Sequence, residues 1–296
     1  MTYLTLAKPV LGTTWRYRLE RYANRILLYL AVGLFLFVVL LPCYWIFISS
    51  FTPKYQMFSI PPRWVPSELT LENYVNLANN IPFFRYYLNS LILAFGSSLL
   101  SVSLAFLAAY ALARIRFRGS NLIFLVFIVS IAIPQIGTLV PLFELYKLVG
   151  LINSREGIIL LMSSLILPFT VWTLVSFIKQ LPEEVEEAAR IDGANLLQLL
   201  VQVVVPVVRP AIGTMIIINF IIAWNELLYP LVFATSTATK TLSVGLVELA
   251  VDPSMGAGRP WDLMSALSVS MIIPVLLVVL FFQRLIVSGL TKGALK

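Results

Sequence analysis

The chain alternates between long apolar stretches and short polar segments along its whole length. Five of the apolar stretches contain no charged residue, and a sixth contains only Glu226. A helix needs about 20 apolar residues to cross the hydrocarbon core of a bilayer, and each stretch is longer than that. The six stretches cover residues 26–53, 86–113, 119–143, 157–178, 210–239 and 263–283.

This pattern predicts an all-α polytopic membrane protein with six transmembrane helices, because lipid leaves helices and closed barrels as the only spanning structures. Too little chain remains for a large soluble domain. The transmembrane domain covers residues 25–287, between a cytoplasmic N-terminal arm (1–24) and a cytoplasmic C-terminal tail (288–296). We place the spans at about 25–51, 87–113, 121–146, 157–179, 207–233 and 262–287.

Composition supports the membrane class and removes several kinds of chemistry. Of 296 residues, 59% are hydrophobic, which is more than a soluble domain of this length buries. The chain has no histidine, the usual metal ligand and neutral-pH acid or base, so we expect no metal site. The single cysteine, Cys43, excludes an intrachain disulfide. No P-loop pattern is present, so we expect the chain itself to bind no nucleotide or other cofactor.

The charges predict which side of the membrane each segment occupies. A net charge of +7 is compatible with nucleic-acid binding, but membrane topology explains it better, and we expect no nucleic-acid partner. With the N-terminus inside, 14 of the 21 Lys and Arg residues fall in inside segments. This bias predicts that both termini are cytoplasmic. The connector with Arg114, Arg116 and Arg118 contributes most clearly, and the basic N-terminal arm is predicted to contact anionic membrane lipid.

Residues 182–206 form an acid-rich segment between two apolar ones, and their pattern predicts a helical hairpin. Pro182 suits the first position of a helix, Gly193 supplies a left-handed turn that ends it, and Asn195 caps a second helix that ends at Pro206. So short a hairpin has little stability by itself, which indicates a binding partner. On the first helix, apolar Leu181, Val185 and Ala188 share one face, and Glu183, Glu186, Glu187 and Arg190 share the other. Glu186 and Arg190 are spaced to form an ion pair.

The spacing in this segment resembles the EAA loop of ABC importer permeases. Glu187-Ala188-Ala189 is followed by three residues, Gly193, twelve residues and Pro206. The family pattern has E-A-A, three residues, G, nine residues and I-x-L-P, so Val203-Val204-Val205-Pro206 departs from it only by exchange of aliphatic residues. Two short motifs, residues 187–194 and Trp224-Asn225-Glu226, resemble the maltose-type carbohydrate branch of this family in particular.

The resemblance extends from about Asn89 to Lys296 and implies a type I importer fold. It implies one membrane subunit of a carbohydrate importer, paired with a second permease, two ATP-binding subunits that hold ATP and Mg, and an extracytoplasmic solute-binding protein. In this family the EAA loop docks in a groove of the ATPase. Glu187 would pair with a base there, Ala188 and Ala189 would allow close approach, and Gly193 would set the bend, with Asp192 and Pro206 in the same motif.

Four polar residues inside or beside apolar stretches are candidates for the translocation path: Gln135, Asn219, Asn225 and Glu226. Amide and carboxylate groups suit sugar hydroxyls, and an ionisable residue in a span indicates a functional site. Glu226 has two other interpretations, reaching to the outer interface or bonding a neighbouring helix. Pro134, Pro168 and Pro274 lie near the middle of three spans and predict kinks around a shared centre, in a gate or only in helix packing.

The predicted outer loop, residues 234–261, is rich in Ser, Thr, Gly and Pro. In maltose-type relatives this loop reaches toward the binding protein, so the resemblance implies contacts from Asp252, Pro253, Met255 and Gly256. Two other classes remain open. A proton-coupled secondary transporter would use Glu226 but leaves the hairpin unexplained. An intramembrane enzyme has little support, because the chain shows no pairing of a nucleophile with a base.

Overall fold

The structure is a computed structural model that describes residues 14–61, 63–251 and 259–294. Every element in those ranges is a helix, which confirms the predicted all-α membrane architecture. Five helices are long and apolar enough to cross a membrane, and a bent pair makes a sixth crossing if it is one span. The long helices are α1 (Thr14–Ser50), α4 (Phe83–Arg114), α7 (Arg155–Ile178), α10 (Val205–Trp224) and α13 (Trp261–Ala294).

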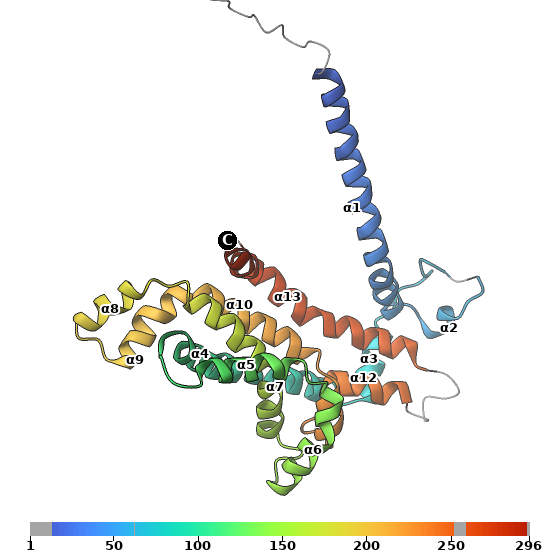
Figure 1. Cartoon of the computed structure of the whole chain (residues 1–296). Helices are drawn as coiled ribbons and strands as arrows, with labels where there is room; N and C mark the ends of the chain where they lie inside the picture. Colours follow the sequence, from blue (N-terminus) through green and yellow to red (C-terminus); the bar gives the residue numbers. More distant parts are fainter. Residues whose placement is uncertain (1–13, 62, 252–258, 295–296) are drawn as a thin grey trace, which may run out of the picture.

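Shorter helices connect the long ones. They are α2 (Lys54–Met57), α3 (Glu72–Asn80), α5 (Ser120–Ile131), α6 (Gln135–Leu148), α8 (Glu183–Ile191), α9 (Leu196–Gln198), the π-helical η1 (Leu199–Val204), α11 (Leu228–Phe233) and α12 (Leu242–Val251). The body is elongated, with α8 and α9 at one end and α3 and α12 at the other (Figure 1). Within it, α4 packs along both α7 and α10, and α13 covers α10.

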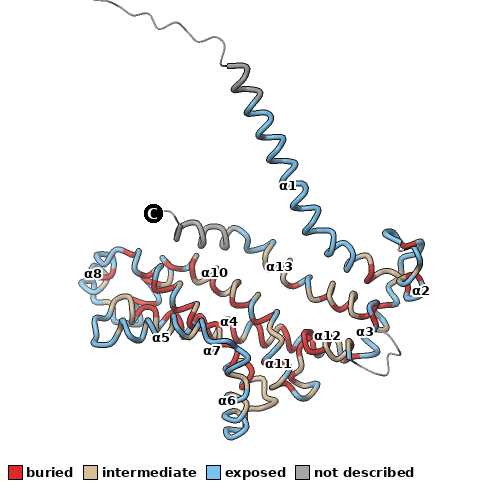
Figure 2. Tube along the Cα trace, turned by 45° about the vertical axis from the view of Figure 1, so that its right-hand side comes forward, coloured by how far each residue is buried: buried red, intermediate tan, exposed pale blue. Residues whose placement is uncertain are grey.

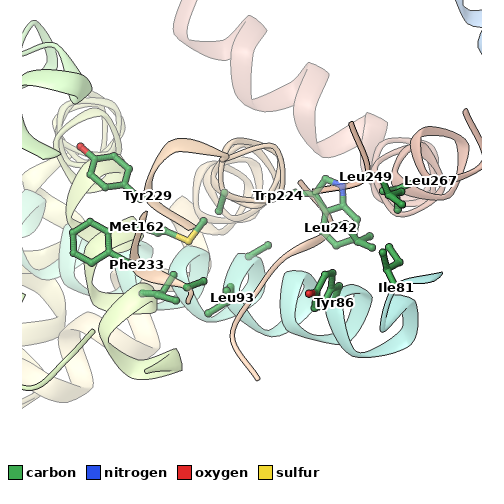
Figure 3. Close-up of a cluster of buried hydrophobic side chains, with 14 of the residues drawn as sticks. Ile81, Tyr86, Leu93, Met162, Trp224, Tyr229, Phe233, Leu242, Leu249 and Leu267 are labelled. Atoms are coloured by element: carbon green, nitrogen blue, oxygen red, sulfur yellow. The ribbon is translucent and has the colours of Figure 1, made fainter. Parts of the chain in front are cut away.

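Two apolar clusters hold this body together, one toward each end. The cluster near α3 and α12 joins Tyr86 and Leu93 of α4 to Trp224, Tyr229 and other residues of the later helices (Figure 3). The cluster near the α8 end joins the last turns of α4 and α7 to η1 and α10. Because α4, α7 and α10 contribute residues to both clusters, these three helices form the centre that connects the two ends.

Helix α1 leaves this body and is exposed from residue 20 to residue 47 (Figure 2). Its C-terminal end is anchored: Asn73 Nδ2 donates to the carbonyl oxygens of Ser50 and Thr52, at 3.0 and 2.9 Å, and the Tyr44 hydroxyl donates to Trp64 O at 2.7 Å. The Tyr74 hydroxyl also donates to Ser50 Oγ at 2.8 Å. An apolar helix of this length needs lipid or another protein around it.

The segment predicted as the third span is not one kinked helix but two helices that meet at 106°. Pro134 has no N–H to donate, and its ring disfavours helical backbone at the residue before it, so α5 ends at Ile131 and α6 begins after Pro134. Pro168 and Pro274 instead lie inside the continuous helices α7 and α13. Of the three candidate prolines, only Pro134 accompanies a break in its helix.

The segment predicted as the fifth span, 207–233, also differs from the expectation. A continuous helical segment runs from Leu196 to Trp224, and α11 follows as a separate short helix. The second hairpin helix therefore does not end at Pro206. Pro206 lies inside this continuous segment, directly after the π-helical turns of η1, and such an irregular turn is where a helix accommodates a residue without an N–H.

The predicted outer loop 234–261 contains a helix, α12, that the sequence analysis did not anticipate. Its residues Leu242, Val244 and Leu249 are buried, and the helix packs against α4 and α13. Small and polar residues on both sides of α12 made the segment look like a loop. The four residues predicted to contact a binding protein, Asp252, Pro253, Met255 and Gly256, lie outside the described residues.

The start of α7 depends on close packing at Gly157. Ser154 caps the helix, because its Oγ accepts from Gly157 N at 3.0 Å. A Cβ on Gly157 would lie 2.3 Å from Leu151 O and 2.7 Å from Ser154 Oγ. We therefore expect Gly157→Ala to lower the free energy of unfolding by about 3 kcal/mol, as overpacking does. Thermal unfolding of the purified protein measures this, with Gly137→Ala as control because no atom lies within 4 Å of that Cβ position. Equal melting temperatures for the two variants would contradict it.

Candidate functional site

A helical hairpin projects from the end of the body opposite α12 (Figure 1). Its first helix is α8, which follows Pro182, and its turn includes Gly193 at a φ of 87°. Asn195 then starts the second arm with a capping box: its Oδ1 accepts from Gln198 N, and its own N–H donates to Gln198 Oε1, each at 2.9 Å. These positions adopt the local geometry that their residue types favour.

The outer surface of the hairpin combines acids with exposed apolar side chains. Glu187, Ala188, Asp192 and Gly193 are exposed, and Ala189 is half-buried. The exposed fractions of the neighbouring apolar residues are large: Val185 42%, Ile191 86%, Leu196 59% and Leu197 71%. So much apolar surface on a small projecting element is typical of a binding site for another protein.

Glu186, which the sequence analysis placed on the exposed charged face of α8, is buried, with 2% of its surface exposed. Arg114 Nε donates to Glu186 Oε1 at 2.6 Å, and the Tyr110 hydroxyl donates to Oε2 at 2.9 Å. The predicted pair with Arg190 is present at 3.9 Å, with 57% of the Arg190 side chain exposed. The face of α8 was misassigned because the sequence did not show that Arg114 reaches this position.

A cavity of about 230 Å³ lies beside the break between α5 and α6. Its walls come from α5, α6, α7 and α10, and its lining is apolar apart from Ser130, Gln135 and Glu226. The structure thus brings together two of the four predicted path residues, Gln135 and Glu226. A mainly apolar pocket with few polar groups is the usual form of a small-molecule site.

Glu226 lies in the gap between α10 and α11. Its Oε1 accepts at 3.4 Å from the backbone N of Tyr229, a residue in the first turn of α11. The Tyr229 hydroxyl in turn lies 2.8 Å from Thr138 Oγ1 and donates to Gln135 O at 3.3 Å. The broken helix therefore leaves Glu226 beside the cavity, and Tyr229, which the sequence analysis did not single out, ties this region to α6.

The other two path candidates do not line the cavity. Asn219 is fully buried, and its Nδ2 donates to Thr170 Oγ1 at 2.9 Å, which joins α10 to α7. Asn225 is exposed, and its Nδ2 donates to Ile221 O of its own helix at 2.8 Å. The described contacts therefore give Asn219 a packing role and Asn225 a role in ending α10.

A polar network at the opposite end of the body fixes the segment that leads into α12. Asn153 Oδ1 accepts from Thr239 Oγ1 at 2.6 Å and from three further donors, the backbone N of Thr235 and the N and Oγ of Ser236. Arg155 Nη2 donates to Asn89 Oδ1 at 2.9 Å, and Asn89 Nδ2 donates to Lys240 O at 3.0 Å. The only sequence signal for this network was a set of polar residues at span ends.

Comparison with known proteins places these features in one family. The model of the family described as "Binding-protein-dependent transport system inner membrane component" matches residues 101–292, which include the hairpin, the cavity and α12. The chain belongs to this family. It is an ABC importer permease subunit and a multi-pass inner-membrane protein, as the resemblance of the hairpin to the EAA loop predicted.

Two relatives match this permease over nearly their whole length. The inner membrane ABC transporter permease protein YcjP of Escherichia coli (strain K12) is 34% identical over 94% of this chain and 98% of its own. The trehalose/maltose transport system permease protein MalG of Thermococcus litoralis is 35% identical over 94% of this chain and 99% of its own.

A solved structure has the same fold. A chain of a bacterial ABC transporter involved in the import of the acidic polysaccharide alginate aligns with a TM-score of 0.76, at 24% identity. The alignment covers 90% of this permease and 96% of that chain. The likeness supports the type I importer fold for the permease.

Proposed function

We propose that this permease forms half of the translocation path of an ATP-driven carbohydrate importer. The projecting hairpin carries this proposal, because it exposes apolar and acidic residues at one end of the body. A carbohydrate substrate is supported by the Thermococcus litoralis relative, which is a permease of a trehalose/maltose transport system. The chain itself is a transport subunit, and ATP hydrolysis takes place on separate subunits that hold ATP and Mg.

The hairpin docks on an ATP-binding subunit in this proposal. Glu187 is exposed and free to face a basic group there, and Ala188 beside it leaves room for close approach. The exposed side chains of Ile191 and Leu197 supply apolar surface that is buried on docking. The hairpin continues directly into α7 on one side and α10 on the other, so movement of the ATPase is passed to two spans.

The remaining partners follow from the exposed surfaces and the family. A second, different permease completes the path, and two ATP-binding subunits lie on the hairpin side, which is the cytoplasmic side with both termini. An extracytoplasmic solute-binding protein delivers the sugar at the opposite end. The family description supports that last partner, since its members serve binding-protein-dependent transport. The exposed α1 lies in lipid or against the second permease.

The cavity beside Pro134 forms part of the sugar path. Gln135 and Glu226 offer hydrogen bonds to hydroxyl groups, and the apolar wall suits the carbon face of a sugar ring. The relatives and solved structure give no support to a proton-coupled transporter, and Glu226 is assigned here to sugar binding or gating instead.

Uptake into proteoliposomes tests this function. We expect the complete complex, with its second permease and ATPase, to take up labelled trehalose or maltose only when ATP and the loaded binding protein are supplied. A protonophore should leave the rate unchanged while ATP is present, because no proton is transported. The matched control is this permease reconstituted alone. Uptake by the permease alone, or collapse of uptake with the proton gradient, would contradict the proposal.

A further inference from the structure

Glu186 differs from the other acids of α8. The side chain of Glu183 is 67% exposed, and Glu184 and Glu187 are exposed, whereas only 2% of Glu186 is accessible. Both oxygens of Glu186 are bound by α4, one by Arg114 and the other by Tyr110. Burying a carboxylate costs free energy unless the group is paired and hydrogen-bonded. The contacts of Glu186 therefore hold α8 at one defined position against α4.

Arg114 joins three elements at once. It is the last residue of α4, and its side chain is 7% exposed. Its Nε binds Glu186 of α8, and its Nη2 donates to Leu181 O, in the connector that follows α7, at 2.5 Å. Tyr110, one turn earlier on α4, belongs to the apolar cluster that includes Leu199 and Val204 of η1. The end of α4 therefore contacts α8 and the connector before it, and it also packs against η1, which follows α9.

From this arrangement we propose that Arg114 and Tyr110 latch the hairpin to α4 and pass the motion of the ATPase to that helix. The hairpin then moves with α4 as one body, in addition to its covalent connections to α7 and α10. Because α4 packs along both α7 and α10, its displacement shifts the walls of the cavity. Arg114, Tyr110 and Glu186 are positioning residues, and the inference rests on the proposed docking of the hairpin.

The number of sugar molecules transported per ATP hydrolysed tests the latch. In assembled complexes, we expect Arg114→Gln to lower this ratio about tenfold while ATP hydrolysis continues, because coupling between two sites is weakened. Tyr110→Phe removes one hydrogen bond and should lower the ratio less. Arg116→Gln is the matched control, since Arg116 lies in the same connector with an exposed side chain and its variant should keep the normal ratio. An unchanged ratio in assembled Arg114→Gln complexes would overturn the latch.

A cross-link between α4 and α8 tests whether the Arg114–Glu186 contact couples the two helices or only stabilises the fold. It also tests the proposal if the Arg114→Gln complex fails to assemble. Cys43 is the chain's single cysteine, so Cys43→Ser provides a background for Arg114→Cys with Glu186→Cys. Joining the two new thiols with a short bifunctional reagent should restore coupled uptake, because hairpin and α4 again move together. Arrest of uptake on cross-linking, or uptake that stays low afterwards, would overturn the proposal.

Failure of the latch and failure of docking give different results. If the hairpin does not dock on the ATPase, Gly193→Val at its turn leaves coupling intact, and so does Arg114→Gln. If docking holds and only the latch is wrong, Gly193→Val loses coupling while Arg114→Gln keeps it.

Discussion

Gly193→Val should abolish most of the coupled transport and reduce co-purification of the ATP-binding subunit about tenfold or more. Gly193 has a φ of 87°, and a β-branched residue held in that region costs on the order of 1–3 kcal/mol. Relief of that strain changes the angle between α8 and α9, and with it the surface that we propose to dock. No atom lies within 4 Å of a Cβ at this position, so the effect arises from the backbone and not from a clash. Affinity purification of the complex and uptake assays in proteoliposomes measure both losses.

Gly193→Asn is the matched control, because asparagine tolerates left-handed backbone better than other non-glycine residues. We expect it to retain most of the co-purification and uptake. Glu187→Lys tests the same surface without changing the turn: reversal of an exposed charge should weaken docking while the permease still folds. Full coupled uptake in both Gly193→Val and Glu187→Lys would remove the docking hypothesis.

Glu226→Gln should lower sugar uptake about tenfold while the complex still assembles. The change keeps the shape of the side chain but removes its charge, and a hydrogen bond to a charged group is worth about 1.5–3 kcal/mol. Glu226 lines the cavity, and its only side-chain hydrogen bond to the described residues is a long one, 3.4 Å from Tyr229 N. Its carboxylate is thus available to a sugar hydroxyl. Uptake per assembled complex, with assembly measured by co-elution of the partner subunits, checks the result.

Two variants test whether this effect belongs to the cavity. Asn225→Ala changes the adjacent residue, which is exposed and bonds its own helix, and should leave uptake near normal. Gln135→Ala changes the second polar side chain of the cavity and should lower uptake as Glu226→Gln does. If Glu226→Gln transports at the normal rate, or if its loss of uptake only parallels a loss of assembly, Glu226 has a packing role.

The sequence predicted features that depend on local chemistry. Apolar stretches longer than a bilayer crossing gave the all-α membrane class, since lipid allows few other structures. The position of Gly193 gave the turn of the hairpin, because its positive φ is a property of a few residues and not of their surroundings. Pro134 correctly marked an irregularity in its span, but a proline alone does not set the 106° between α5 and α6. In the folded chain α6 also contacts residues far along the sequence, as the hydroxyls of Thr138 and Tyr229 do at 2.8 Å.

Only the tertiary structure decided which polar groups lie together. Acids occupy more than one face of α8, and Glu186 is the buried one because Arg114 and Tyr110, more than 70 residues earlier, arrive beside it. In the same way, Gln135 and Glu226 share a cavity while Asn219 pairs with Thr170, although all were equivalent as polar residues in apolar stretches. Hydropathy and turn residues act over a few neighbours along the chain, so the sequence determined the all-α membrane class and the turn of the hairpin. Burial and ion pairing act through space, so the packing of α4 against the hairpin, α7 and α10 decided the sites.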